Sequence, residues 1–232
     1  MSIEDNRLDK DRKQDIAYDF LMEKIISLQI LPGQYINEGE IISQLKCSRT
    51  PVREAIQRLI SDKILESIPG KGTYVSKITI EDIIAIYDFR SVLDSYLVQL
   101  VAKNLTDKAL TELEENVRKQ REAINRGDYI HRLVLDKEFN HLMLDLARND
   151  WLKDAISRLL IHTDRISNQL YRNYISPSVD LERQATYSAD TRANLLAELK
   201  AGDLEKAQII VEERWLHFKR LYFDIFKQRA NI

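Results

Sequence analysis

The segment Cys47–Ile60, with the sequence CSRTPVREAIQRLI, decides how the N-terminal part of the chain folds. Ser48 is favourable at the start of a helix, and Pro51 would fall in the first turn, where its missing N–H does no harm. Apolar residues then recur at the spacing of one helix face: Val52, Ala55, Ile56 and Leu59. We therefore predict an amphipathic helix that begins just after Ser48.

Three polar residues near the start of this helix lie off its apolar face: Arg49, Thr50 and Arg53. A helix with arginines at its exposed N-terminal end can lie in the major groove of DNA, where guanidinium groups reach guanine edges or phosphates. The alternative is a surface helix with two solvated arginines. The flanking sequence favours the DNA-binding interpretation.

Two helices are predicted before Cys47. Apolar residues between Ile16 and Leu28 recur at helical spacing, and Leu31-Pro32-Gly33 ends this first helix with a turn. A second helix is expected from about Glu38 to Leu45, with a tight turn through residues 44–47 into the helix described above. Two short helices joined in this way are typical of a helix-turn-helix.

The residues after Asp62 predict a small hairpin. Two β-prone runs, residues 64–68 and 73–76, flank the turn Pro69-Gly70-Lys71-Gly72. A hairpin directly after a helix-turn-helix is a wing. Glycines at its tip allow a close approach to a phosphate backbone, where Lys71 adds a positive charge.

Composition limits the classes of protein that this chain can belong to. Its 232 residues are 44% hydrophobic and 31% charged, which indicates a soluble protein with a proper core. The net charge is −2, and residues 10–77 hold eleven basic and nine acidic residues, so charge permits DNA binding without arguing for it. Cys47 is the single cysteine, which excludes a disulfide framework. We see no signal peptide and no membrane span, and we expect a cytoplasmic protein.

The chain is predicted to be mainly α, with a flexible arm over residues 1–13, a winged helix-turn-helix over 14–77 and an all-helical bundle over 78–232. Few glycines and prolines interrupt the C-terminal part. Candidate helices there cover residues 81–103, 106–126, 129–147, 151–174, 181–201 and 203–229. Helices of this length form a bundle.

The N-terminal pattern resembles the winged helix of the GntR family of bacterial transcription regulators. The resemblance rests on Leu31-Pro32-Gly33, on SRTPVREA (residues 48–55), on Leu59 and on GKGTYV (residues 70–75). It implies a homodimer on double-stranded palindromic operator DNA. The implied DNA-binding residues are Arg49, Thr50, Pro51 and Arg53 in the groove and Gly70, Lys71 and Gly72 at the wing. Glu38 stands near a position where some members carry a phosphate-binding arginine.

The C-terminal part resembles the FCD effector domain of the FadR branch of that family, through RSVLD (residues 90–94), Leu135-Asp136 with Phe139, and Ala201-Gly202-Asp203 with Ala207. Many members bind a divalent metal through one Asp and three His. Asp136 matches the Asp, but the histidine positions fall on Asn140, Arg192 and Arg214. Guanidinium has no lone pair to donate, so we predict that the metal site is lost and that there is no cofactor. The alternative is a rearranged metal site that uses His141, His162 or His217.

Two interpretations of Arg192 and Arg214 remain. Either they form buried ion pairs with Asp136 that replace the charge of the metal, or they bind an anionic effector, to which arginine makes bidentate contacts. Both can hold together, and we favour effector binding. Arg90 and Arg165 are further candidates for this pocket, with a surface position as the equal alternative.

The predicted function is sequence-specific transcriptional regulation, as a repressor, controlled by a small anion such as an organic or sugar acid. The sequence contains no nucleophile elbow, phosphate loop or acid/base pair, so an enzyme is not expected. A helical adaptor without regulated DNA binding is the alternative. The sequence leaves the identities of the effector and of the operator open.

Overall fold

The structure, a computed structural model, describes residues 3–173 and 181–230, and these divide into two units. Unit 1 contains the chain up to Thr79 together with Ile161–Arg172. Unit 2 contains Ile80–Leu160 and the residues from Asn173 onward. The division after Thr79 lies close to the predicted one after residue 77, whereas the association of Ile161–Arg172 with the N-terminal part was not predicted.

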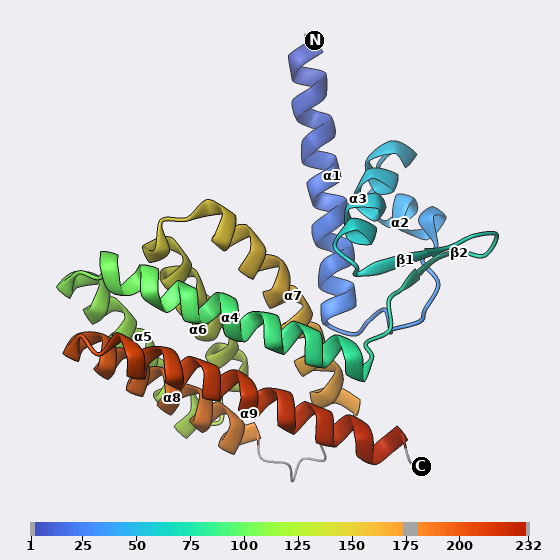
Figure 1. Cartoon of the computed structure of the whole chain (residues 1–232). Helices are drawn as coiled ribbons and strands as arrows, with labels where there is room; N and C mark the ends of the chain where they lie inside the picture. Colours follow the sequence, from blue (N-terminus) through green and yellow to red (C-terminus); the bar gives the residue numbers. More distant parts are fainter. Residues whose placement is uncertain (1–2, 174–180, 231–232) are drawn as a thin grey trace. The chain divides into compact units, whose positions relative to one another are not determined.

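Unit 1 contains a winged helix-turn-helix (Figure 1). Its elements are α1 (Ile3–Ile26), α2 (Glu38–Leu45), α3 (Arg49–Ser61), β1 (Leu65–Ile68) and β2 (Gly72–Val75). The two strands pair antiparallel, with Leu65 opposite Val75 and Ile68 opposite Gly72. The segment before α2 joins the same sheet, because Ile36 N donates to Thr73 O (2.8 Å) and Val75 N donates to Gln34 O (2.9 Å).

The first helix is longer than predicted. α1 begins at Ile3, so residues 3–13 are helical and do not form a separate arm. Polar and charged residues there include many good helix formers, and neither Gly nor Pro occurs before the end of the helix. The core side of α1 begins at Ala17, while Ile16, which we assigned to the apolar face, is 49% exposed.

One hydrophobic core holds the elements of unit 1 together. α1 contributes Leu21 and Ile25, and α3 contributes the predicted apolar face, whose four members are all at most 2% exposed. Asn37 caps α2 by accepting from the backbone N–H groups of Gly39 (3.0 Å) and Glu40 (3.4 Å). Burial of this continuous apolar set is the main force that orients α3 against α1.

The second half of α7 (Asp150–Asn173) belongs to unit 1, where three polar side chains bind backbone carbonyls of the winged helix. His162 Nε2 lies 2.9 Å from Asp62 O, Arg165 donates to Ser76 O (2.7 Å), and Asn168 donates to Ile26 O (3.0 Å). Each carbonyl lies at or near the end of an element, where helices and strands leave acceptors free. These bonds tie α7 to three places in the winged helix.

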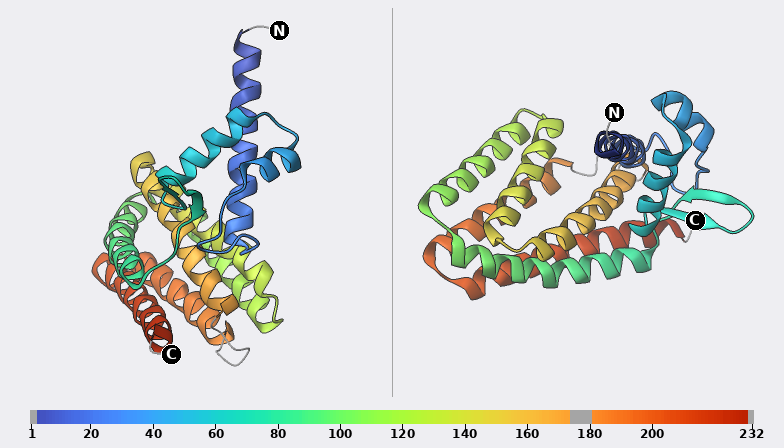
Figure 2. Two further views of the ribbon diagram at one scale, coloured as in Figure 1. Left: turned by 90° about the vertical axis from the view of Figure 1, so that its right-hand side faces the viewer. Right: turned by 90° about the horizontal axis from the view of Figure 1, so that it is seen from above.

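Unit 2 is the predicted all-helical bundle. It consists of α4 (Ile80–Asn104), α5 (Asp107–Asn125), α6 (Tyr129–Ala147), the first half of α7, α8 (Leu181–Ala201) and α9 (Leu204–Ala230). The long helices α4 and α9 run side by side (Figure 2). Helix α5 packs against α6 and α8. These bounds agree closely with those expected, and the fold class is confirmed.

Caps and glycines explain where the helices of unit 2 begin and end. Thr106 caps α5 by accepting from Ala109 N, and Asp128 caps α6 by accepting from His131 N. Gly127 and Gly202 follow α5 and α8 with positive φ angles of 69° and 76°. This left-handed conformation favours glycine and ends a helix.

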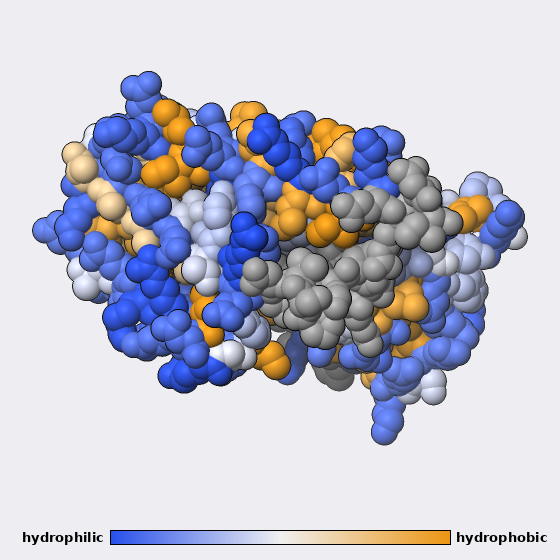
Figure 3. All heavy atoms as spheres, turned by 90° about the horizontal axis from the view of Figure 1, so that it is seen from below, coloured by the Kyte–Doolittle hydropathy of each residue, from blue (hydrophilic) through white to orange (hydrophobic). Residues whose placement is uncertain are grey.

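On the face drawn in Figure 3, the residues that are coloured by hydropathy are mostly hydrophilic, with separate apolar patches. None of the helices in the described residues is long and apolar enough to cross a membrane.

Candidate functional site

The N-terminal end of α3 presents exposed polar groups. Arg49 and Thr50 lie in its first turn and Arg53 one turn later, all exposed. Ser48 stands at the N-cap position, but its side chain makes no capping hydrogen bond within the described chain. The first turn also lacks an acidic residue. Free N–H groups and the positive end of the helix dipole therefore add to the charge of the two arginines.

Arg53 forms an ion pair with Glu38, the first residue of α2. Its Nε lies 3.0 Å from Glu38 Oε2, with the two side chains 60% and 35% exposed. An ion pair this open to water is weak, because solvent and salt screen it. Arg53 can therefore exchange Glu38 for a phosphate or a guanine edge.

Pro51 is not part of this surface. It is buried, like Val52 beside it, and so lies on the core side of α3. Its missing N–H suits the first turn of the helix. The prediction that Pro51 contacts DNA is therefore corrected to a role in helix initiation and packing.

The wing tip combines one exposed cation with two glycines that serve different purposes. Lys71 and Gly70 lie exposed in the turn, and Gly70 has φ +73° with open space where a Cβ would be. Gly72 has φ +109°, and an added Cβ would lie 2.7 Å from Tyr35 Cε2. Gly72 is thus required by packing against Tyr35, which explains it without any contact to DNA.

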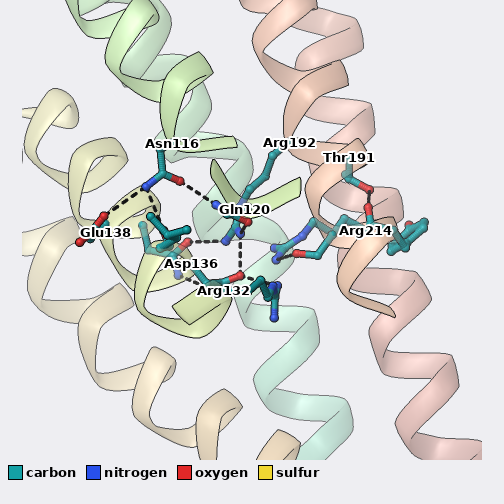
Figure 4. Close-up of polar contacts among 12 residues, drawn as sticks. Asn116, Gln120, Arg132, Asp136, Glu138, Thr191, Arg192 and Arg214 are labelled. Carbon is teal, nitrogen blue, oxygen red and sulfur yellow. Dashed lines mark hydrogen bonds and ion pairs between the residues drawn. The ribbon is translucent and has the colours of Figure 1, made fainter. Parts of the chain in front are cut away.

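Unit 2 contains a buried polar cluster around Asp136 (Figure 4). Asp136 Oδ1 accepts from Arg192 (2.6 Å) and from Arg132 (2.7 Å). Asn140, one turn after Asp136 on α6, donates to Asp136 Oδ2 (3.4 Å) and accepts from Arg192 (3.2 Å). The structure thus brings together the predicted residues Asp136, Asn140 and Arg192, while Arg132 was not predicted.

Two amide side chains on α5 extend the hydrogen-bond network around Arg192. Gln120, which is 0% exposed, accepts from Arg192 Nη1 (2.9 Å) and donates to Asn116 (2.7 Å), which in turn donates to Leu135 O (3.1 Å). Sequence analysis missed both amides. The available signal was that they lie four residues apart on the buried stripe of α5, where a polar residue needs a partner.

Asp136 is ionised in this cluster. Burial alone would raise the pKa of its carboxyl group, but the positive charges of Arg192 and Arg132 outweigh burial and hold the pKa well below its usual range. The carboxylate therefore keeps both guanidinium groups in place at every physiological pH.

Arg214, on α9, lies in the same region without a carboxylate partner. Its strongest polar contact within the described chain is a long hydrogen bond to Ser188 Oγ (3.4 Å), and its guanidinium stacks near the rings of Trp215 (4.6 Å) and Phe218 (5.3 Å). Burial and the charge of Arg192 lower its pKa to about 10. It remains a cation at neutral pH. Of the two interpretations, the ion pair with Asp136 forms for Arg192 and not for Arg214 among the described residues.

Arg90 provides a further buried cation on α4. It is 3% exposed and pairs with Asp94 (2.6 Å), which also accepts from the indole N–H of Trp215 (2.9 Å). Its Nε and Nη1 have no hydrogen-bond partner among the described atoms.

These residues border a cavity of about 50 Å³ inside unit 2. Arg90, Arg192 and Arg214 form its cationic side, and Asn140 and Thr191 add amide and hydroxyl groups. The carboxylate of Asp94 also lines the cavity. The remaining wall is apolar and is formed by Leu97, Val98, Phe139, Met143, Leu144, Ile156, Leu195 and Val211.

Arg165 does not line this cavity. It belongs to unit 1, where it is 4% exposed and bound to Ser76 O. Arg165 was predicted to face the pocket because it lies on the same helix as Ile156. This was wrong because α7 passes from one unit into the other.

The residues around Asp136 do not fit a divalent metal. The positions implied for histidine hold an amide and two guanidinium groups, and neither Arg192 nor Arg214 can donate a lone pair. His162 binds Asp62 O in unit 1, His217 lies 3.1 Å from Gln184 Oε1, and His141 is exposed. The part of the chain that the structure describes contains no cluster of three His, Cys, Asp or Glu that could hold a metal.

Comparisons with known proteins match both parts of the chain. Residues 13–75 match the family described as "Bacterial regulatory proteins, gntR family", and residues 85–215 match the FCD domain. Over 170 residues, the chain is 30% identical to the HTH-type transcriptional regulator YdhC of Bacillus subtilis, covering 72% of this chain and 76% of that one.

A further relative and a solved structure agree with these family matches. The HTH-type transcriptional repressor RspR of Escherichia coli is 29% identical, over 72% of this chain and 73% of that one. The solved structure of E. coli McbR/YncC has the same fold, with a TM-score of 0.76 at 24% identity, covering 92% of this chain and 98% of that one. The chain therefore belongs to the GntR family of bacterial regulatory proteins and is a transcriptional regulator with an FCD domain.

Proposed function

We propose that this regulator binds operator DNA through the N-terminal end of α3 and the wing tip. The observation that carries the proposal is the exposed cationic start of α3, where Arg49, Thr50 and Arg53 accompany uncapped backbone N–H groups. Side chains in this position can contact base edges, while Lys71 at the wing contacts phosphate. The resemblance to RspR, which is named a repressor, supports repression as the direction of control.

The experiment is a fluorescence anisotropy titration of the protein with a duplex from its own promoter, over a range of salt concentrations. Arg53→Ala should weaken binding to the operator more than binding to unrelated DNA, by roughly 1–3 kcal/mol if it contacts a base. Lys71→Ala should weaken both about equally and lower the salt slope by about 0.9.

Lys108→Ala is the control, because it removes one equally positive and exposed side chain from unit 2. It should leave the affinity and the salt slope unchanged. Normal operator binding by Arg53→Ala would refute the assignment of α3 as the recognition helix.

We also propose that a small anion binds in the cavity of unit 2 and changes operator affinity. Its support is the cluster of guanidinium groups at positions where the family resemblance implies metal ligands. Arg192 is held by Asp136, Gln120 and Asn140, so a fixed cation occupies the place of the metal charge. Arginine is well suited to bind carboxylates and phosphates.

The helix α7 offers a route for coupling. Ile156 in its first half lines the cavity, and its second half forms the three hydrogen bonds to the winged helix in unit 1. Because α7 is one continuous helix, we propose that a displacement of its first half on ligand binding is passed along it to the second half, which bonds to Asp62, Ser76 and Ile26. Ligand and DNA would then influence each other's affinity reciprocally.

We propose that the protein is a cytoplasmic homodimer that joins through α4. Phe89, Val92 and Tyr96 recur there at positions three and four apart, which lie on one helix face, and they are 53%, 66% and 45% exposed. Apolar side chains gathered in this way mark an interface. Sedimentation analysis of Val92→Asp should find a monomer, with Lys108→Ala remaining a dimer.

A further inference from the structure

The cavity in unit 2 carries more positive than negative charge. Three buried or half-buried arginines line it (Arg90, Arg192 and Arg214), and the carboxylates paired with the first two are Asp94 and Asp136. Arg90 is neutralised by Asp94, and Arg132 and Arg192 share Asp136. Arg214 has no carboxylate within ion-pair distance among the described residues, so the site lacks an anion on the side of α9.

Unused hydrogen-bond donors point to the same place. Arg214 Nε and Arg90 Nε and Nη1 are buried without a partner in the described chain. Both arginines line the cavity and stack within 4.6 Å of the same ring, that of Trp215. Buried N–H groups normally have acceptors, and a carboxylate provides two oxygens that can satisfy such a pair of guanidinium groups.

The rest of the cavity suits a ligand body with few hydroxyl groups. Its wall away from the arginines is aliphatic and aromatic, with Leu97, Met143 and Ile156 among its members. Three other polar side chains line it. Thr191 donates to Tyr187 O (2.7 Å), and the Asn140 amide bonds to Asp136 and Arg192. Asp94 accepts from Arg90 and Trp215 through Oδ2, while its Oδ1 is buried without a partner in the described chain. A sugar acid carries several hydroxyls, and Asp94 Oδ1 is the single unpartnered acceptor among these described side chains, so most of the hydroxyls would lose water without gaining partners.

The volume limits the ligand further. The cavity measures about 50 Å³, and about 10–15 Å³ suffices for one water molecule. It can therefore accept only a few non-hydrogen atoms without rearrangement. We infer that the effector is a short-chain monocarboxylic acid, with its carboxylate on Arg214 and Arg90 and its alkyl group against the apolar wall. This inference rests on the proposed effector site and narrows it to one chemical class.

The test is calorimetric titration and thermal melting of the full-length protein with four probes of similar size or charge. Isobutyrate is the candidate, isobutyramide has the same shape without charge, glycerate has the same charge with hydroxyls, and succinate has a second carboxylate. Isobutyrate should raise Tm and bind at least tenfold more tightly than each of the others. Arg214→Gln should weaken isobutyrate binding at least tenfold.

Arg121→Gln is the matched control, because Arg121 is an exposed arginine of unit 2 that pairs with Asp190 outside the cavity. It should bind isobutyrate like the unaltered protein. The comparison of isobutyrate with isobutyramide needs no variant, so it remains decisive if Arg214→Gln does not fold.

The outcomes separate this inference from the proposed function. Tighter binding of glycerate or succinate that Arg214→Gln abolishes would overturn the ligand class and leave the effector site intact. Equal binding of isobutyrate and isobutyramide, or unchanged isobutyrate binding by Arg214→Gln, would refute the assignment of Arg214 and Arg90 as the groups that bind the carboxylate. If none of the acids binds while operator binding stays normal, both the class and the anion site are wrong, and the DNA-binding proposal stands.

Discussion

Replacing Asp136 by Asn tests the central feature of unit 2, the carboxylate that holds two buried guanidinium groups. Asp136 forms ion pairs of 2.6 Å with Arg192 and 2.7 Å with Arg132, and the three side chains are 21%, 3% and 12% exposed. Removing one partner of a buried pair costs about 3–5 kcal/mol, because the remaining charge stays buried without compensation.

The partial exposure of Asp136 places the expected loss at the lower end, about 3 kcal/mol. For a unit of this size, 1 kcal/mol corresponds to roughly 2–4 °C, so Tm should fall by about 6–12 °C. The assay is thermal and urea unfolding at neutral pH. Asp145→Asn is the control, because Asp145 lies on the same helix in an exposed ion pair with Lys153 and its removal should leave Tm nearly unchanged.

The pH dependence gives a second readout. The pKa of Asp136 is lower in the folded state than the usual value near 3.9 of an unfolded chain. The stabilisation is therefore complete above about pH 5 and is lost as the pH falls below about 4 toward the folded pKa. The difference in stability between the unaltered protein and Asp136→Asn should shrink over that range.

The double variant Asp136→Asn with Arg192→Met, compared with the two single variants, completes a double-mutant cycle. It removes one of the two guanidinium groups that Asp136→Asn leaves uncompensated, the other being that of Arg132, so it should be more stable than the sum of the two single changes predicts. A Tm of Asp136→Asn equal to that of Asp145→Asn, or strict additivity in the cycle, would refute the assignment of Asp136 as the anchor of the cluster.

Three further predictions concern unit 1. Glu38→Gln should tighten operator binding and steepen its salt dependence, because Arg53 no longer has a competing carboxylate; weaker binding in the anisotropy titration would mean that Glu38 orients Arg53 for DNA. Gly72→Ala should lower the free energy of unfolding by roughly 1–3 kcal/mol, because Gly72 has a positive φ and an added Cβ would meet Tyr35. Gly70→Asn should be nearly neutral, and equal effects of the two changes in urea unfolding would contradict the packing role of Gly72. Burial, together with the hydrogen bond to Asp62, raises the pKa of Tyr18 to about 12, so the spectrophotometric titration of the tyrosines should contain a late ionisation that disappears in Tyr18→Phe; identical titration curves for the two proteins would exclude it.

Much of the fold followed from local patterns. The helix spacing of apolar residues, the caps at Asn37 and Thr106 and the glycines after α5 and α8 are properties of short segments, so the bounds of most elements could be predicted. The family resemblance placed Asp136, Asn140 and Arg192 together because they occupy equivalent positions on packed helices. The start of α1 was misjudged because polar composition alone does not separate an exposed helix from an arm.

The sequence by itself determined the winged helix-turn-helix, the helical bundle and the cationic start of α3. Only the tertiary structure decided which groups the arginine side chains bind. Arg53 with Glu38, Arg192 with Gln120 and Arg165 with Ser76 are 15, 72 and 89 residues apart. No local pattern encodes such pairings, because they depend on how helices pack. The same holds for Arg214, for which the packed helices bring no carboxylate within ion-pair distance among the described residues.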